Sequence, residues 1–489
     1  MANRPNILLI LTDQHRLSAV GAYGDTPCRT PHLDLLVQAG TRFETAYTTC
    51  PLCSPARASI MTGMWPHRHG VTANINNMTS ACHSLPDNPG LLPRQLQAQG
   101  YRTGYSGKWH LGEEESSARL GKYAAPWPHI ESMPRDFGFD GQNFPGHGGG
   151  GFGYPEYEEY LAKNDWRHEL VNGELTGPLE STVPYFLTSN TLSLIDQYKD
   201  GDAPFFIWHN FWGPHGPYFA TREYNDIYRD MVLPPWPNFD WPSRQTPGPH
   251  QAKINPRAES MTWEGNWQPL LRHYYAFTSM IDDQIGRTLR HLEESGLAEN
   301  TIVIFSADHG ETCGSHGGLT DKGYHHFEEI QRIPLIIRGP GVDEGSVRNE
   351  LASLADIMPT ICDLAGSPAT GDPIQGRSLT PLLRGQSVKD WREDIVVEFD
   401  GLNQGACTLR TLRHGPYKYG LNLVHEDELY DLERDPWETR NLVNDPGYQN
   451  IARDLRGRLF GWLKEADDQT LCIFRDKQAY YTEKEKAQS

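Results

Sequence analysis

The chain has 489 residues, 37% of them hydrophobic, which is enough for one large domain with a smaller one beside it. Its 44 Lys and Arg residues are outnumbered by 63 Asp and Glu residues. The resulting net charge of −19 argues against nucleic acid or an anionic membrane as the main partner. Local positive charges must therefore hold any anionic substrate.

The first residues do not have the pattern of a targeting segment. The apolar run at residues 7–11 is too short for the core of a signal peptide before Asp13 and His15 follow. No later run approaches the ~18 apolar residues that a membrane span needs. We therefore expect a cytoplasmic enzyme with reduced thiols and no membrane partner.

Apolar runs that end in polar residues predict the strands, and apolar residues at helical spacing predict the helices. The expected strands cover residues 6–12, 102–106, 203–209, 301–306 and 334–338. The expected helices cover residues 56–61, 91–99, 269–297 and 355–365, with 269–297 the longest. Strands that alternate with helices predict an α/β fold, a large, doubly wound, mostly parallel sheet.

Beyond residue 385 the pattern changes to short strands and turns, followed by a final helix over residues 448–464. We therefore predict a large catalytic domain at residues 1–385 and a small C-terminal α+β domain at residues 386–489. The glycine-rich stretch at 146–153 lacks the Lys and Ser or Thr of a P-loop, so a flexible insertion is predicted there.

Residues 51–63, PLCSPARASIMTG, place a cysteine, a proline and an arginine at CxPxR spacing. Ser54 is a favourable N-cap and Pro55 suits the first helical position. The pattern therefore predicts that the helix over residues 56–61 begins just after Cys53.

A cysteine at this place faces the positive end of a helix dipole, with Arg57 one turn along. An anion would be favoured beside its sulfur. Two other interpretations of the motif are a buried structural cysteine and a redox pair of Cys50 with Cys53.

Polar side chains follow two of the predicted strands, where open α/β sheets place their ligand sites. Asp13 and Gln14 follow the first strand, and Asp308 and His309 follow the strand at 301–306. Oxygen donors with one imidazole suit Ca²⁺, Mg²⁺ or Mn²⁺ better than Zn²⁺. Each residue alone is also compatible with a turn or a helix cap.

The CxPxR stretch resembles the sulfatase signature at every position from 51 to 63. Residues 100–110, GYRTGYSGKWH, resemble the second signature of that family, and ELYDLERDPWETRNL resembles a segment of its small C-terminal domain. The chain is therefore similar, over nearly its whole length, to the formylglycine-dependent type I sulfatases of the alkaline phosphatase superfamily.

This resemblance implies an alkaline phosphatase-like fold and hydrolysis of a sulfate ester by S–O cleavage. Cys53 would be oxidised by a formylglycine-generating enzyme to formylglycine (3-oxoalanine), whose hydrate is the nucleophile. One divalent cation is implied as well, commonly Ca²⁺, with Mn²⁺ and Mg²⁺ left open. The ligands implied for it are Asp13, Gln14, Cys53, Asp308 and His309. Gln14 departs from the family pattern, because many members carry a second Asp there.

The resemblance also implies roles for the surrounding residues. Arg57 and Lys108 would hold the sulfuryl oxygens, and His110 would take a proton from the formylglycine hydrate. His215, in WGPHGPY, would protonate the leaving alcohol together with Lys322, in LTDKGYHH.

Two alternatives to a sulfatase remain at this point. A formylglycine-dependent phosphonate monoester or phosphodiester hydrolase shares the nucleophile and the metal, but Lys108 together with His110 favours sulfate esters. A non-enzymatic, metal-stabilised binding protein would keep Cys53 as a thiol. The sequence leaves open whether the substrate is a carbohydrate, aryl or alkyl sulfate, and whether the chain forms a homo-oligomer.

Overall fold

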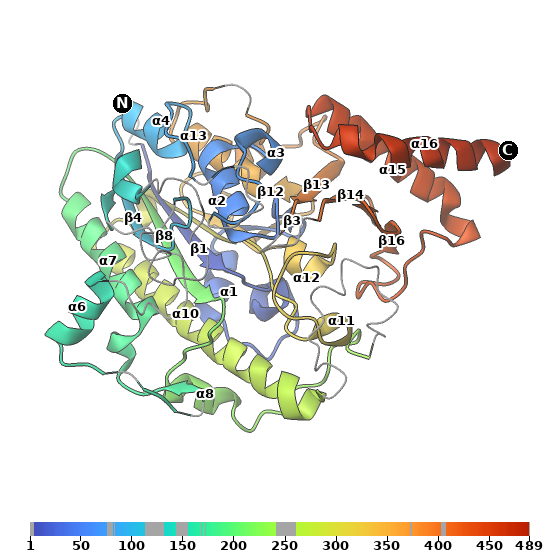
Figure 1. Ribbon diagram of the computed structural model, residues 1–489. Helices are drawn as coiled ribbons and strands as arrows, with labels where there is room; N and C mark the ends of the chain where they lie inside the picture. The colour runs from blue at the N-terminus through green and yellow to red at the C-terminus, as the bar shows by residue number, and fades with distance from the viewer. Residues whose placement is uncertain are drawn as a thin grey trace.

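A computed structural model shows the fold (Figure 1) and describes residues 4–75, 82, 84–112, 132–142, 155–167, 169–171, 173–240, 261–371, 374–401 and 407–488. Its centre is an eight-stranded sheet. The strands lie in the order β11 (Ser346–Arg348), β2 (Thr41–Phe43), β10 (Leu335–Arg338), β9 (Thr301–Ala307), β1 (Asn6–Asp13), β8 (Phe205–Pro214), β4 (Arg102–Gly107) and β5 (Asp140–Gly141).

The middle of this sheet is parallel, as predicted, from β9 through β1, β8 and β4 to β5. All eight residues of β1 are buried, which is the expected consequence of covering a parallel sheet on both faces. The strand β10 differs from the prediction in direction, because it runs antiparallel to both β9 and β2. A run of four residues, LIIR, carries no signal for strand direction.

Helices cover both faces of the sheet (Figure 1). Ile7, Leu9 and Leu11 of β1 pack into a core with α2 (Cys53–Thr62), α4 (Leu92–Ala98) and α13 (Ile357–Leu364). Leu8 and Ile10 point to the opposite face, which is covered by α1 (Pro31–Gln38), α7 (Val183–Tyr198) and α10 (Gln268–Glu294). This alternation along one strand confirms the α/β sandwich that the sequence predicts. The helix α10, predicted over 269–297, is the longest in the described part of the chain.

The C-terminal part has its own antiparallel sheet, seen at the right of Figure 1. Its strands are β13 (Asp394–Phe399), β14 (Leu409–His414), β15 (Tyr417–Asn422) and β16 (Glu428–Asp431). Apolar residues of this sheet and of α15 (Gln449–Glu465) form a separate core. The α+β character is as predicted, and the boundary after residue 385 stays a prediction.

The end of the chain corrects the prediction that α15 is the last helix. A second helix, α16 (Leu471–Gln488), follows it after a short connection. Within that connection, Asp468 accepts a hydrogen bond from Arg410 Nε of β14 at 2.8 Å, and both side chains are fully buried. The predicted insertion at 146–153 lies outside the described residues. None of the described helices is both long and apolar enough to cross a membrane.

Candidate active site

The two central strands bring Asp13 and Asp308 side by side. Because β1 and β9 are adjacent and parallel, with Thr12 paired to Ala307, the residues that follow them leave the sheet at the same edge. The carboxylate Oδ1 of Asp308 then accepts the backbone N–H of Gln14 at 3.0 Å. Gln14 has a φ of 60°, in the left-handed region, so the chain turns sharply as soon as the strand ends.

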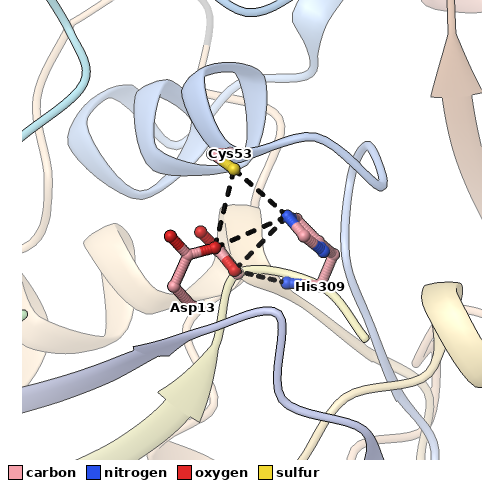
Figure 2. A group of neighbouring side chains, drawn as sticks. Asp13, Cys53 and His309 are labelled. Carbon is pink, nitrogen blue, oxygen red and sulfur yellow. Dashed lines mark hydrogen bonds and ion pairs between the residues drawn. The ribbon is translucent and has the colours of Figure 1, made fainter. Parts of the chain in front are cut away.

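The N-terminus of α2 places Cys53 over this pair of carboxylates (Figure 2). Its sulfur lies 3.6 Å from Oδ1 of Asp13 and 3.3 Å from Nε2 of His309. The side chain is buried, and the first backbone N–H groups of the helix give this end a partial positive charge. Cys53 is thus held at the meeting point of a helix terminus and two strand ends.

The predicted start of this helix is wrong, because the helix begins two residues before Pro55. Cys53 is itself the first helical residue, and the extended residue before it is Leu52. Ser54 is inside the helix, where its hydroxyl donates to the backbone carbonyl of His110 at 2.7 Å and its backbone N–H donates to Asn74. The serine therefore joins the two signature segments instead of capping the helix.

Arg57 is fully buried one turn into α2. It contacts Oδ2 of Asp308 through Nη2 at 3.0 Å and through Nε at 3.2 Å. Its Nη1 donates to the carbonyl of Lys108 and to Oδ1 of Asn210, both at 2.8 Å. The guanidinium is therefore fixed in place by three separate segments of the chain.

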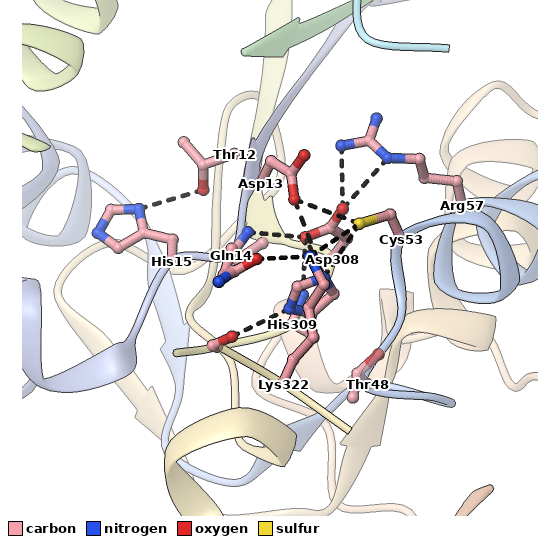
Figure 3. A network of polar contacts seen from close by, with 12 residues as sticks. Thr12, Asp13, Gln14, His15, Thr48, Cys53, Arg57, Asp308, His309 and Lys322 are labelled. Carbon is pink, nitrogen blue, oxygen red and sulfur yellow. Dashed lines mark hydrogen bonds and ion pairs between the residues drawn. The ribbon is translucent and has the colours of Figure 1, made fainter. Parts of the chain in front are cut away.

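Two lysines complete the positive side of the site, and Figure 3 shows one of them, Lys322. Lys108, which follows β4, forms an ion pair with Asp13, and both side chains are buried. Lys322 Nζ donates to the side-chain oxygen of Gln14 at 2.5 Å and lies 3.4 Å from the sulfur of Cys53. Both predicted lysines thus lie in the same buried cluster as the cysteine.

The donor atoms at the strand ends fit a divalent cation. One ligand atom each from Asp13, Cys53, Asp308 and His309 can be chosen so that all four lie within 4.8 Å of one another. Two carboxylates with one imidazole suit Ca²⁺, Mn²⁺ or Mg²⁺ better than Zn²⁺. Gln14 adds an amide oxygen beside this group.

The charged groups of the site shift the pKa values of their neighbours. Burial by itself opposes ionisation of Asp13, but Lys108, His215 and Lys322 together outweigh it and hold the pKa of this carboxyl well below its usual value. Burial together with the charge of Asp13 raises the pKa of Asp308. Burial also opposes ionisation of the Cys53 thiol, yet Lys108 and Lys322 lower its pKa well below the usual value. Two buried carboxylates that repel each other favour a cation between them.

The two predicted catalytic histidines follow two neighbouring strands of the sheet, β4 and β8. His110 follows Lys108 and Trp109 and is buried; burial and the charge of Lys108 lower its pKa well below the usual value. His215 lies after β8, and its Nδ1 is 2.6 Å from the carbonyl of Gly216. Because a carbonyl only accepts hydrogen bonds, Nδ1 carries the proton there.

A pocket of about 190 Å³ opens beside His215. Its lining consists of Gln14, His215, Gly216, Tyr218, Leu270, Glu311, Cys313, Thr320 and Asp321. Tyr218 belongs to the Pro- and Trp-rich stretch that follows β8. The leaving group of a substrate held at Cys53 could enter this pocket, since Gln14 belongs to both places.

Three site residues were not predicted from the sequence. Asn210 accepts a hydrogen bond from Arg57, and Asn74 accepts one from the backbone N–H of Ser54. Glu311 accepts a hydrogen bond from the side chain of Gln14. Asn210 directly follows the strand predicted at 203–209, so the strand-end rule could have found it, although the observed β8 continues to Pro214 and pairs Asn210 with Leu11. Asn74 follows no strand or motif and carries no such signal.

Cys50 and Cys53, the alternative redox pair, are both buried and form no disulfide in the structure. Cys50 is buried, which raises the pKa of its thiol well above the usual value, whereas the pKa of Cys53 is lowered. The two sulfurs are therefore in opposite electrostatic environments.

Comparison with known proteins identifies the family. Residues 5–367 match the sequence profile of the sulfatase family, and residues 314–465 match the profile of the C-terminal region of N-sulphoglucosamine sulphohydrolase. A delta 4,5-hexuronate-2-O-sulfatase of Bacteroides thetaiotaomicron is 30% identical, over 95% of this chain and 90% of its own. The multifunctional alkaline phosphatase superfamily protein PehA of Trinickia caryophylli is 29% identical, over 96% of this chain and 98% of its own.

The fold agrees with these matches. The solved structure of a phosphonate monoester hydrolase from Silicibacter pomeroyi superposes with a TM-score of 0.77 at 22% identity, covering 96% of this chain and 97% of that chain. At this level of identity the likeness shows the fold alone. With the sulfatase profile matched over most of the chain, this protein belongs to the sulfatase family, the sulfuric ester hydrolases of the alkaline phosphatase superfamily.

Proposed function

We propose that the chain hydrolyses the sulfate ester of a carbohydrate or another small molecule by S–O cleavage, with position 53 as the nucleophile after oxidation to formylglycine. The observation that carries this proposal is the position of the Cys53 sulfur. It lies at the N-terminus of α2, 3.4 Å from the Lys322 ammonium and 3.3 Å from Nε2 of His309. A nucleophile and an anion-binding group are therefore adjacent.

Asp13, Gln14, Asp308 and His309 would hold the divalent cation, together with an oxygen at position 53. Ca²⁺ is the first candidate, and Mn²⁺ and Mg²⁺ are the alternatives. When bound, the cation supplies a Lewis acid beside the nucleophile and the sulfuryl oxygens. Formylglycine, made by a formylglycine-generating enzyme, supplies an aldehyde hydrate with two hydroxyls on one carbon.

The other side chains divide between binding the anion and moving protons. Lys108 and Lys322 place two ammonium groups beside position 53, and Arg57 adds a fixed charge behind Asp308. His110 would accept a proton from the nucleophile side. His215, on the pocket side, would protonate the departing alcohol together with Lys322.

The alcohol would lie in the pocket lined by His215, Tyr218 and Asp321. Its volume of about 190 Å³ fits a small group or one sugar ring at the reacting position. The similarity to the delta 4,5-hexuronate-2-O-sulfatase supports a sugar sulfate as the substrate. A screen of carbohydrate, aryl and alkyl sulfates would identify the alcohol.

The alternative is hydrolysis of phosphonate monoesters or phosphodiesters. A phosphonate monoester hydrolase shares the fold of this chain, and at 22% identity the likeness extends to the fold alone. The presence of both Lys108 and His110 favours sulfate esters, since the phosphonate hydrolases of the superfamily lack this pair of residues. A comparison of kcat/KM for an aryl sulfate and the matching aryl phosphonate distinguishes the two, and a higher value for the phosphonate would overturn the sulfatase proposal.

The modification is tested by mass spectrometry of the peptide that spans Cys53, produced in a host with the maturation enzyme. We expect the mass of the aldehyde. A Cys53→Ala variant should fold normally and lose sulfatase activity. Unmodified cysteine in a fully active preparation, or full activity of Cys53→Ala, would contradict the proposal.

A further inference from the structure

The side-chain amide of Gln14 lies between groups of opposite hydrogen-bonding character. Its nitrogen donates to Oε2 of Glu311 and to Oδ1 of Asp321, the latter at 3.1 Å. Its oxygen accepts from the Lys322 ammonium at 2.5 Å, next to the sulfur of Cys53. The amide therefore spans the boundary between the cation site and the acidic residues behind it.

These partners determine which way the amide points. Carboxylates such as those of Glu311 and Asp321 only accept hydrogen bonds, whereas an ammonium group only donates them. The NH₂ group of Gln14 must therefore face the acids and its oxygen must face the site. The opposite orientation would place two donors together at Lys322 and two acceptors together at Glu311.

Glu311 is itself held rigidly. It is 2% exposed, and its Oε1 accepts the backbone N–H groups of Cys313 at 3.1 Å and of Asp321 at 2.6 Å. Only Oε2 remains for the amide of Gln14. The acid cannot turn without breaking two backbone hydrogen bonds in a buried loop.

We propose that Glu311 is a positioning residue that fixes the amide of Gln14 with its oxygen toward the divalent cation. The inference rests on the cation site proposed above. It also accounts for an amide at position 14, because a carboxylate there would face Glu311 and Asp321 and be repelled by both. An acid behind the site thus supplies the orientation, and Gln14 supplies a neutral oxygen ligand.

The test is the affinity for Ca²⁺, measured by calorimetry on the full chain. In Glu311→Gln the new amide oxygen keeps the two backbone hydrogen bonds, so its NH₂ group faces that of Gln14. Gln14 must then turn its oxygen away from the site, and we expect Ca²⁺ affinity to fall 10- to 100-fold. In Gln14→Glu the new carboxylate faces that of Glu311, and the affinity for Ca²⁺ should also fall.

The exchange variant, Gln14→Glu with Glu311→Gln, restores one donor facing one acceptor and the original total charge. We expect it to bind Ca²⁺ at least 10-fold more tightly than either single variant, which a merely structural role of Glu311 would not produce. Glu294→Gln, exposed at the end of α10, is the matched control and should bind as the wild type does.

Thermal unfolding of each variant shows whether it is folded before titration. Wild-type affinity in Glu311→Gln, or an exchange variant no better than the singles, overturns the role of Glu311 while leaving the cation site intact. A wild-type chain that binds none of Ca²⁺, Mn²⁺ and Mg²⁺ in this titration overturns the cation site and this inference together. The formylglycine peptide is measured separately and is unaffected by either result.

Discussion

The guanidinium of Arg57 binds one oxygen of Asp308, Oδ2, through two of its nitrogens, at 3.0 Å and 3.2 Å. The other oxygen of Asp308 accepts the backbone N–H groups of Gln14 and His309. Four hydrogen bonds therefore hold this carboxylate in a fixed orientation. Arg57 therefore fixes the orientation of Asp308, a proposed cation ligand, and also places a positive charge near the proposed binding site of the substrate.

We expect Arg57→Gln to lower kcat/KM for an aryl sulfate by at least ~100-fold, because a fixed positive charge is lost beside the reacting group. It should also lower the free energy of unfolding by about 3–5 kcal/mol, since Asp308 is left buried without its partner. Urea unfolding and steady-state kinetics measure the two effects. Arg458→Gln, on a half-exposed pair with Asp454, should cost less than about 1 kcal/mol. Equal losses in both variants would contradict the assignment.

Gly107 ends β4 with a φ of 110°, and a Cβ there would lie 1.6 Å from the carbonyl oxygen of Asn210. Gly107→Ala should therefore displace Asn210, which accepts a hydrogen bond from Arg57. We expect a loss of about 2–4 kcal/mol in the free energy of unfolding and a drop in sulfatase activity. Gly415→Ala is the control, because its φ is also positive but no atom lies within 4 Å of the added carbon. Its cost should be about 1 kcal/mol, with activity unchanged.

His209 lies inside β8, where burial lowers its pKa to about 3. The folded chain keeps this ring neutral, whereas the unfolded chain takes up a proton near pH 6.5. The unfolded state therefore binds more protons below that pH, and the free energy of unfolding falls as the pH is lowered from 6.5 toward 3. Between pH 7.5 and pH 5 this one histidine should cost about 2 kcal/mol.

Urea unfolding at the two pH values tests this expectation. His209→Gln should reduce the difference between them by about 2 kcal/mol, because the titrating group is gone. His425→Gln, whose side chain is exposed, should leave the difference as in the wild type. An unchanged pH dependence in His209→Gln would show that this ring is not held neutral.

Arg410 of β14 forms ion pairs with Asp468 at 2.8 Å and with Asp400 at 3.0 Å. Removal of the guanidinium in Arg410→Met leaves Asp468 buried and uncompensated, and we expect a loss of about 3–5 kcal/mol. The double variant with Asp468→Asn should regain part of this loss, because the uncompensated charge is removed. Chemical unfolding of the wild type, the two single variants and the double variant gives the interaction free energy between Arg410 and Asp468. Strictly additive losses in the free energy of unfolding would contradict this interaction.

The sequence predicted the parts of the site that follow from strand ends and from the CxPxR stretch. Asp13 and Asp308 come directly after the two apolar runs that form β1 and β9, so their convergence follows from parallel pairing alone. Cys53 and Arg57 follow from the CxPxR spacing, which places them one turn apart on α2, although this helix begins earlier than predicted.

Other features could not be predicted, because they depend on tertiary contacts. Glu311 and Asn74 act only through their hydrogen bonds to Gln14 and Ser54, and no local pattern encodes these bonds. The antiparallel direction of β10 is set by the connections around it, because its four residues carry no signal for either direction.

Under the proposed oxidation of Cys53 to formylglycine, the burial of this side chain would limit the time at which the oxidising enzyme can act. Its side chain is 1% exposed in the folded chain, beneath the first turn of α2. An oxidising enzyme has to touch the sulfur, so it can do so only while this segment is still open to solvent. Molecules that fold first would keep the thiol, and a preparation would then contain active and permanently inactive copies of the same fold. The specific activity of a batch would consequently report how folding and oxidation competed in the producing cell.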